Sequence, residues 1–132
     1  MKGLRLYKKE KLCSPVAIDM LFGARRTGAV QSATAYPLRA VWRGNSARSS
    51  DSPVAFLISI PKKRLRHAVD RVTMRRRVRE AYRLARPDFP MPAGTRIDLA
   101  FVYVADRLMP YASVDRAVRR IMERLRANAA AD

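Results

Sequence analysis

The stretch from residue 54 to residue 86 constrains the fold more than any other part of the chain. It begins with a nearly continuous apolar run, Val54 to Ile60, which is typical of a central strand buried on both faces. Pro61 ends this strand, and the next residues predict a helix from about Leu65 to Arg86, which Pro87 terminates. A buried strand followed by a long helix favours a sheet with helices packed against it.

The expected helix has one apolar face and one basic face. At about 100° per residue, its apolar side chains fall within about 100° of arc and predict a core-facing stripe. These are Met74, Val78, Ala81, Tyr82 and Ala85. The opposite side carries Arg75, Arg76, Arg79, Arg83 and Arg86. Arg71 lies at the edge of the apolar stripe. Val72 lies in the middle of the arginine face, where it must meet solvent or a partner.

The charge of the chain indicates a polyanionic partner. Its 132 residues predict a single domain over residues 1–132, large enough to bury a core without disulfides, and 48% of them are hydrophobic. The formal net charge is +17, which favours a phosphate backbone as the partner. An anionic membrane is the weaker alternative, since no apolar run approaches the roughly 20 residues that span a bilayer. The single Cys13 suits a reducing cytoplasm and inert packing.

The remaining segments predict an α+β fold. Ser14 and Pro15 open a first helix that ends at Gly23 or Gly28, and residues 29–43 alternate as extended structure. Residues 44–53 form a mobile connector, residues 97–104 a further strand, and a last helix begins at Ser113 and frays over 128–132. We expect a two-layer α/β sandwich, with three helices on one face of a small mixed sheet of about four strands.

Residues suited to catalysis do not cluster. His67 is the only histidine, and Cys13 and His67 are too few for a metal site. The acidic residues Asp19, Asp98, Asp106 and Asp115 show no metal-cluster spacing, and five scattered glycines form no phosphate loop. A binding protein is therefore expected, without a catalytic residue or metal ligand of its own.

The basic helix and the strand before it resemble the signature of the bacterial ribonuclease P protein family. That family has a strand ending in Lys-Lys, followed by a helix with Ala-Val-x-Arg-Asn-Arg-x-Lys-Arg-x-x-Arg-Glu, and residues 59–83 are similar to it. The segments 5–9, Leu21-Phe22 and 36–39 are also similar. The family's Arg-Asn-Arg reads Arg71-Val72-Thr73 here.

The resemblance implies a cytoplasmic ribonucleoprotein that removes the 5′ leader from precursor transfer RNA. Its partners would be a catalytic RNA subunit, which uses Mg²⁺, and the precursor tRNA, with no obligatory protein partner. The protein subunit would assist without catalysing. The family fold is an α/β sandwich with a left-handed βαβ crossover.

Two sets of residues are candidates for RNA contact. The basic set follows the strand end and the helix: Lys62, Lys63, Arg64, Arg66, Arg71, Arg75, Arg76, Arg79 and Arg83. By the resemblance, a cleft between the first helix and the sheet would hold the single-stranded leader, lined by Ile18, Phe22, Tyr36, Trp42 and Ser59. The aromatic rings are suited to stacking on bases, and each could equally pack in the core.

Two other functions are also compatible with the sequence. A ribosome-associated RNA-binding protein would also explain the charge. A DNA-binding protein could place the helix of Arg75 to Arg86 in a major groove, but that face lacks the Asn or Gln that commonly reads adenine.

Overall fold

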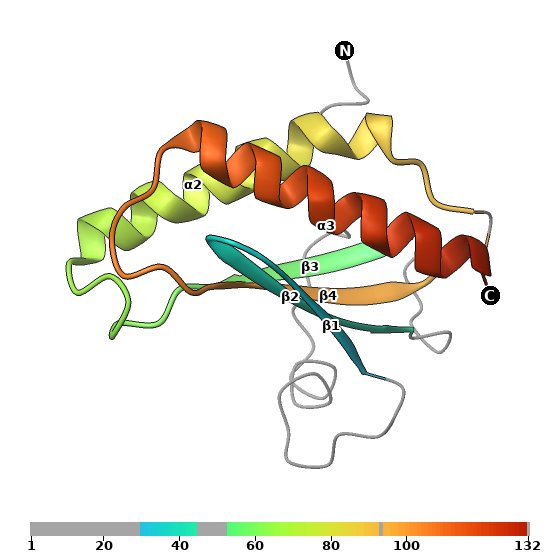
Figure 1. Cartoon of the computed structure of the whole chain (residues 1–132), viewed down its shortest axis with the longest axis horizontal. Coiled ribbons are helices and arrows are strands. Elements are labelled where there is room, and N and C mark those ends of the chain that lie inside the picture. The colour runs from blue at the N-terminus through green and yellow to red at the C-terminus, as the bar shows by residue number, and fades with distance from the viewer. Residues whose placement is uncertain (1–29, 45–52, 93, 132) are drawn as a thin grey trace.

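The computed structural model describes residues 30–44, 53–92 and 94–131, which form two layers (Figure 1). Helices α2 and α3 cover one face of a four-stranded sheet. The elements in chain order are β1 (Gln31–Ala35), β2 (Leu38–Gly44), β3 (Val54–Ser59), α2 (Ala68–Ala85), the 3₁₀ turn η3 (Arg86–Asp88), β4 (Ile97–Tyr103) and α3 (Tyr111–Ala131). The α+β class and the mixed four-stranded sheet are therefore confirmed. The helix predicted from Ser14 lies outside the described residues.

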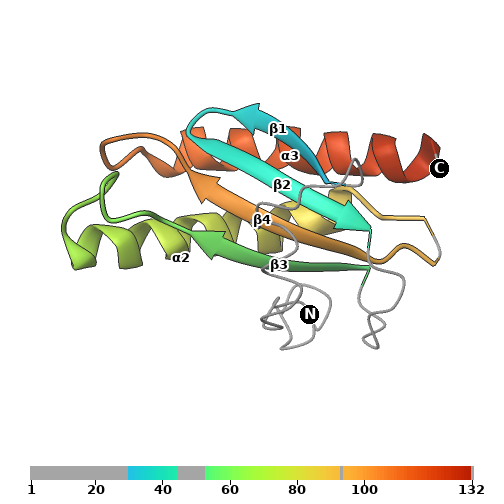
Figure 2. The ribbon, with the colours of Figure 1, turned by 90° about the horizontal axis from the view of Figure 1, so that it is seen from below.

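The strand order in the sheet is β1-β2-β4-β3 (Figure 2). β1 pairs antiparallel with β2, and β2 pairs antiparallel with β4. β3 pairs parallel with β4, so this sheet needs a crossover connection, which α2 supplies. In register, Arg43 of β2 lies opposite Asp98 of β4, which in turn lies opposite Ala55 of β3.

The crossover from β3 through α2 to β4 is left-handed. In Figure 2 both strands point to the left, β4 lies above β3, and α2 lies behind the sheet. If the view of Figure 2 is rotated so that the strands point upward, β4 lies to the right of β3. The chain then leaves the top of β3, passes behind the sheet through α2 and enters β4. Nearly all βαβ crossovers have the opposite hand. The connection brings the first turn of α2 to the end of the sheet where β3 finishes (Figure 2).

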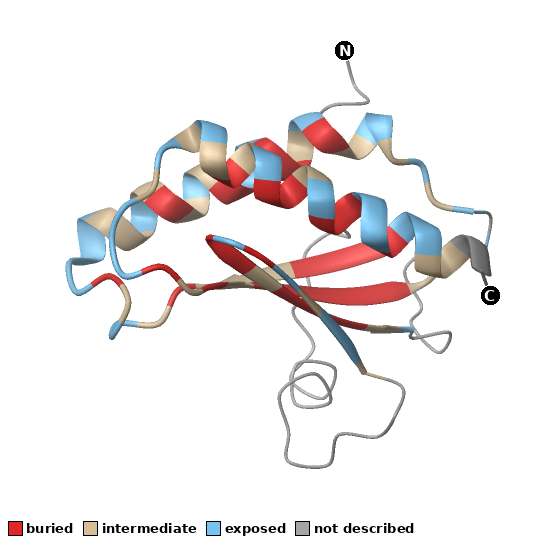
Figure 3. Ribbon diagram, viewed as in Figure 1, coloured by how far each residue is buried: buried red, intermediate tan, exposed pale blue. Residues whose placement is uncertain are grey.

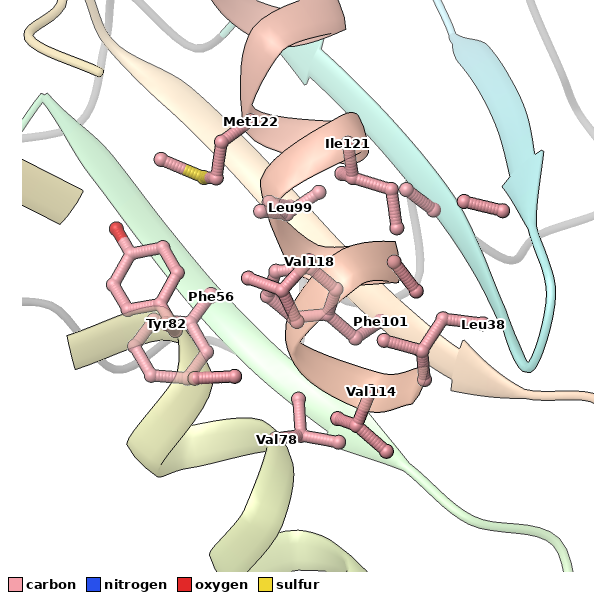
Figure 4. Close-up of a cluster of buried hydrophobic side chains, with 14 of the residues drawn as sticks. Leu38, Phe56, Val78, Tyr82, Leu99, Phe101, Val114, Val118, Ile121 and Met122 are labelled. Atoms are coloured by element: carbon pink, nitrogen blue, oxygen red, sulfur yellow. The ribbon is translucent and has the colours of Figure 1, made fainter. Parts of the chain in front are cut away.

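The main core lies between the sheet and the two helices (Figure 4). Phe56 of β3, Tyr82 of α2 and Phe101 of β4 form an aromatic group with ring centroids 4.3 to 6.1 Å apart. Helix α3 contributes Val114, Val118, Ile121 and Met122, and β2 contributes Leu38. The apolar stripe of each helix is therefore the surface that holds it to the sheet.

Several element boundaries differ from the prediction. α2 begins at Ala68 rather than near Leu65, because the N–H groups of Arg64 and Leu65 donate to the carbonyl of Pro61 and form a separate turn. Residues 29–43 are not one extended segment, since a turn at Tyr36-Pro37 divides them into β1 and β2.

The last helix is longer at both ends than predicted. α3 begins at Tyr111, because the carbonyl of Pro110 accepts the N–H groups of Ser113 and Val114. It continues to Ala131, and within the predicted frayed tail Asn128 donates to Gln31 Oε1 of β1 at 2.7 Å.

Tyr103 fixes the loop between β4 and α3. The side chain is fully buried, and its hydroxyl donates to the carbonyl of Arg107 and accepts the N–H of Met109 at 3.1 Å. The carbonyl of Met109 accepts in turn from Arg77 of α2. Burial raises the pKa of the Tyr103 hydroxyl, which therefore stays protonated and can keep donating.

We expect Tyr103→Phe to lower the free energy of unfolding by about 1 to 2 kcal/mol, because two backbone groups lose their partner. Urea denaturation of the full chain measures this change. Tyr111→Phe is the matched control, since the Tyr111 hydroxyl is buried with no hydrogen bond among the described residues. Equal losses in the two variants would contradict the role given to the Tyr103 hydroxyl.

Candidate nucleic-acid interface

Helix α2 separates an apolar face from a basic face, as predicted. Its buried residues are the five of the predicted stripe: Met74, Val78, Ala81, Tyr82 and Ala85. The basic face of α2 consists of Arg75, Arg76, Arg79 and Arg83, together with Arg86 at the start of η3. Of these, Arg76 and Arg79 are exposed and the others are half-buried. Figure 3 shows the buried positions of α2 turned to the sheet and the exposed positions turned away.

Glu80 neutralises one arginine of this face. Arg83 donates to both carboxylate oxygens of Glu80, from Nε at 2.8 Å and from Nη2 at 2.7 Å. The hydrogen bond from Arg83 lowers the pKa of Glu80, so the carboxylate stays charged at neutral pH. The guanidinium of Arg83 is therefore already occupied by a carboxylate in the free protein.

Three arginines of the face remain without such a counter-charge. Within residues 30–44, 53–92 and 94–131, no acidic side chain forms an ion pair with Arg75, Arg76 or Arg79. Like charges one turn apart on a helix repel each other. A polyanion bound along this face would relieve that repulsion, and arginine offers bidentate contacts to phosphate.

The segment between β3 and α2 presents further cations beside the first turn of the helix. Lys62, Lys63 and Arg66 are exposed, and Arg64 is half-buried. Leu65 is 4% exposed and anchors the segment to the core. The sequence-predicted pair Lys62-Lys63 therefore lies on a short, anchored turn next to the basic face of α2.

Arg71 braces this segment. Its Nη1 donates to the carbonyl of Leu65 at 2.8 Å and to that of Arg66 at 3.0 Å. The predicted RNA-binding residue Arg71 therefore already holds the turn that carries the lysines. Its position at the edge of the apolar stripe allows both tasks, since the stem packs while the head reaches the backbone.

Val72 is exposed on the basic side, as its position in the sequence predicts. Its side chain is 44% exposed, and that of Val69, one turn earlier, is 70% exposed. Next to Val72, Thr73 donates its hydroxyl to the carbonyl of Val69 at 3.0 Å. Val69 was not among the predicted site residues, although its spacing of three from Val72 places both on one side of the helix.

One of the residues predicted for a leader cleft, Trp42, does not lie on an open surface. Tyr36 is 57% exposed at the turn between β1 and β2. Trp42 is 4% exposed and packs in the core on the helix side of the sheet, so its ring lines no open cleft. The prediction for Trp42 is corrected accordingly. Ser59 lies half-buried at the end of β3. Ile18 and Phe22 lie outside the described residues.

The sheet face away from the helices contains a buried charge. Asp98 is fully buried, and its Oδ2 lies 4.0 Å from Nη2 of the cross-strand neighbour Arg43. The small residues Val41, Ala55 and Ala100 form a second buried cluster on this face. Asp98 is therefore part of the sheet structure, a role that its place in the sequence did not indicate.

Among the described residues, no three His, Cys, Asp or Glu side chains gather closely enough to hold a metal ion. His67 is exposed just before α2 and makes no side-chain capping bond. None of the described helices combines the length and apolar composition needed to cross a membrane.

A family model and two known proteins match nearly the whole chain. The family model for ribonuclease P matches residues 6–126. The chain is 35% identical over 127 residues to the ribonuclease P protein component of Porphyromonas gingivalis strain ATCC 33277. It is 35% identical over 127 residues to the protein of the same name from strain W83. In both cases 93% of this chain and 88% of the relative are covered.

Proposed function

Because the chain belongs to the ribonuclease P protein family, we propose that the basic face of α2 and the turn with Lys62 and Lys63 bind its RNA subunit. Proteins of this family are part of a ribonucleoprotein endoribonuclease that acts in tRNA 5′ processing. The observation that carries the proposal is the set of arginines on α2 without acidic partners in the described structure, Arg75, Arg76 and Arg79.

The exposed lysines extend the same surface. Lys62 and Lys63 follow β3, and the bracing bonds from Arg71 hold their turn against the first part of α2. A phosphate backbone that follows α2 would meet these lysines at one end and Arg79 near the other. Contacts of this kind position an RNA without reading its sequence, which suits a partner recognised by shape.

We place the single-stranded leader of precursor tRNA on the sheet face away from α2 and α3. Ser59 and Arg39 lie on this face in one row of the sheet, because each is the register partner of Val102. Arg39 is half-buried and supplies a positive charge beside the Ser59 hydroxyl. Tyr36, Ile18 and Phe22 stay candidates for stacking on leader bases, whereas the buried Trp42 is excluded.

The chain would assist catalysis rather than perform it, in the cytoplasm and without a further protein partner. Mg²⁺ held by the RNA subunit would supply the chemistry of phosphodiester hydrolysis. Among the described residues no three His, Cys, Asp or Glu side chains gather to hold Mg²⁺, and the buried carboxylate of Asp98 lies 4.0 Å from Arg43. Here the residues of the chain bind and orient RNA.

Gel-shift titration of the full chain tests this function. The probes are the RNA subunit from the same genome, a ribosomal RNA fragment of equal length and duplex DNA, all at one stated ionic strength. We expect the RNA subunit to bind most tightly. Tighter binding to ribosomal RNA would favour a ribosome-associated protein, and tighter binding to duplex DNA a DNA-binding protein.

The double substitution Val72→Asn with Thr73→Arg is expected to raise affinity for the RNA subunit about fivefold to tenfold, or roughly 1 to 1.4 kcal/mol. It restores the two residue types that the family has there and adds a cation beside Arg76. The single variants Val72→Asn and Thr73→Arg separate the two contributions in the same gel shift. A marked loss of affinity in the double variant would mean that α2 meets the RNA by another face.

A further inference from the structure

A groove of about 310 Å³ lies between strand β1 and helix α3. β1 is the edge strand of the described sheet opposite β3, so the groove and the basic face of α2 lie at opposite sides of the molecule (Figure 2). Small side chains leave this space open, since Ala33 and Ala35 of β1 face Ile121 and Ala127 of α3 across it. The groove is thus separate from the surface proposed above for the RNA subunit.

Two arginines of α3 line the groove. Arg120 and Arg124 are exposed and one helical turn apart. In the described part of the chain neither makes an ion pair, although Glu123 also lines the groove. The neighbouring Arg119 behaves differently, because it pairs with Asp88 at 2.8 Å and with Asp115 at 3.3 Å. The groove therefore keeps two positive charges against one negative charge.

We propose that this groove binds a single-stranded segment of RNA. Proteins hold single strands in positively charged grooves that follow the backbone and give the sugars and bases an apolar surface. Arg120 and Arg124 would contact phosphates along one wall, and the exposed Thr34 hydroxyl would face them from β1. Ala33, Ala35 and Ile121 supply the apolar floor.

The family to which the chain belongs favours RNA over an extended peptide as the occupant. An edge strand can also accept a peptide strand through its backbone groups. The positive field of a chain with net charge +17 would attract an acidic peptide as well as an RNA segment. RNA is the favoured occupant because the chain belongs to a family that acts as part of a ribonucleoprotein.

The proposal rests on the proposed function for the identity of the RNA, which is either the RNA subunit or the precursor tRNA. Either source presents the same phosphodiester backbone. A protein with RNA contacts on both sides would hold two RNA segments apart at a fixed distance.

The first experiment measures binding of the full chain to oligouridine of about 12 nucleotides, a length within the range of single-strand sites. The test variant is Arg120→Gln with Arg124→Gln. The control is Arg116→Gln with Arg126→Gln, which removes the same charge from exposed positions of α3 that do not line the groove. We expect the groove variant to bind about tenfold more weakly. Its salt slope should fall by about 1.4, from two phosphate contacts at about 0.7 each.

The second experiment identifies the source by titrating the same variants with the RNA subunit alone and with precursor tRNA on the assembled complex. If the groove variant loses affinity for only one of these two RNAs, that RNA is the occupant of the groove. Equal behaviour of groove and control variants with all three RNAs would overturn the proposal, as would a larger loss with a polyglutamate peptide than with RNA. Failure of the wild-type chain to bind the RNA subunit would instead count against the proposed function, and the oligouridine result would still decide the groove.

Discussion

Charge reversal of Arg76 and Arg79 to glutamate is expected to weaken binding of the RNA subunit by about 100-fold, or roughly 2.7 kcal/mol. Both side chains are exposed, and no acidic residue in the described structure pairs with them. The free protein therefore loses little when they change. The complex loses two phosphate contacts and gains two carboxylates facing the RNA backbone.

Filter binding over a range of salt concentrations measures this effect. The matched control is Arg116→Glu with Arg126→Glu, which changes the net charge equally on α3. The control should bind the RNA subunit about threefold more weakly, because the positive field of the whole chain is weaker. Similar losses in the two double variants would show that only net charge matters and that α2 has no special position in the complex.

Phe101→Ala is expected to lower the free energy of unfolding by about 3 to 5 kcal/mol. Phe101 is fully buried in the central strand β4, and its ring lies 6.1 Å from that of Phe56 and 6.0 Å from that of Tyr82. Truncation leaves a cavity between the sheet and α2 that neighbouring groups cannot close without moving the helix.

Chemical denaturation followed by circular dichroism measures that loss. Val102→Ala is the control, because Val102 is the next residue of the same strand, faces away from the helices and is half-buried. The free energy of unfolding of this control should fall by about 1 kcal/mol. A loss for Phe101→Ala no greater than that of Val102→Ala would contradict the assigned core.

The features that could be predicted from the sequence are those with a local cause. The five buried residues of α2 follow from helical periodicity alone, and so does the exposure of Val72. The strands at residues 54–59 and 97–103 follow from mostly apolar runs between prolines, glycine and turn residues, the second of them interrupted by Asp98. These signals need no knowledge of what packs against them.

The features that could not be predicted depend on contacts between distant residues. Alternation along β2 places Leu38, Ala40 and Trp42 on one face, but only the assembled sheet shows that this face is the core. The pair of Arg43 and Asp98 joins two strands far apart in the chain. Arg71 has the same charge as its neighbours, and its bracing role appears only with the turn of Leu65 and Arg66 in place.

Release of the 5′ leader from precursor tRNA at low Mg²⁺ concentration tests the central claim most directly. The full chain and the RNA subunit from the same genome are combined, and cleavage is followed with the wild-type chain and with the Arg76→Glu, Arg79→Glu variant. We predict that the wild-type chain stimulates cleavage and that the variant needs about 100-fold more protein for the same rate. No stimulation by the wild-type chain, or equal stimulation by the variant, would contradict the claim.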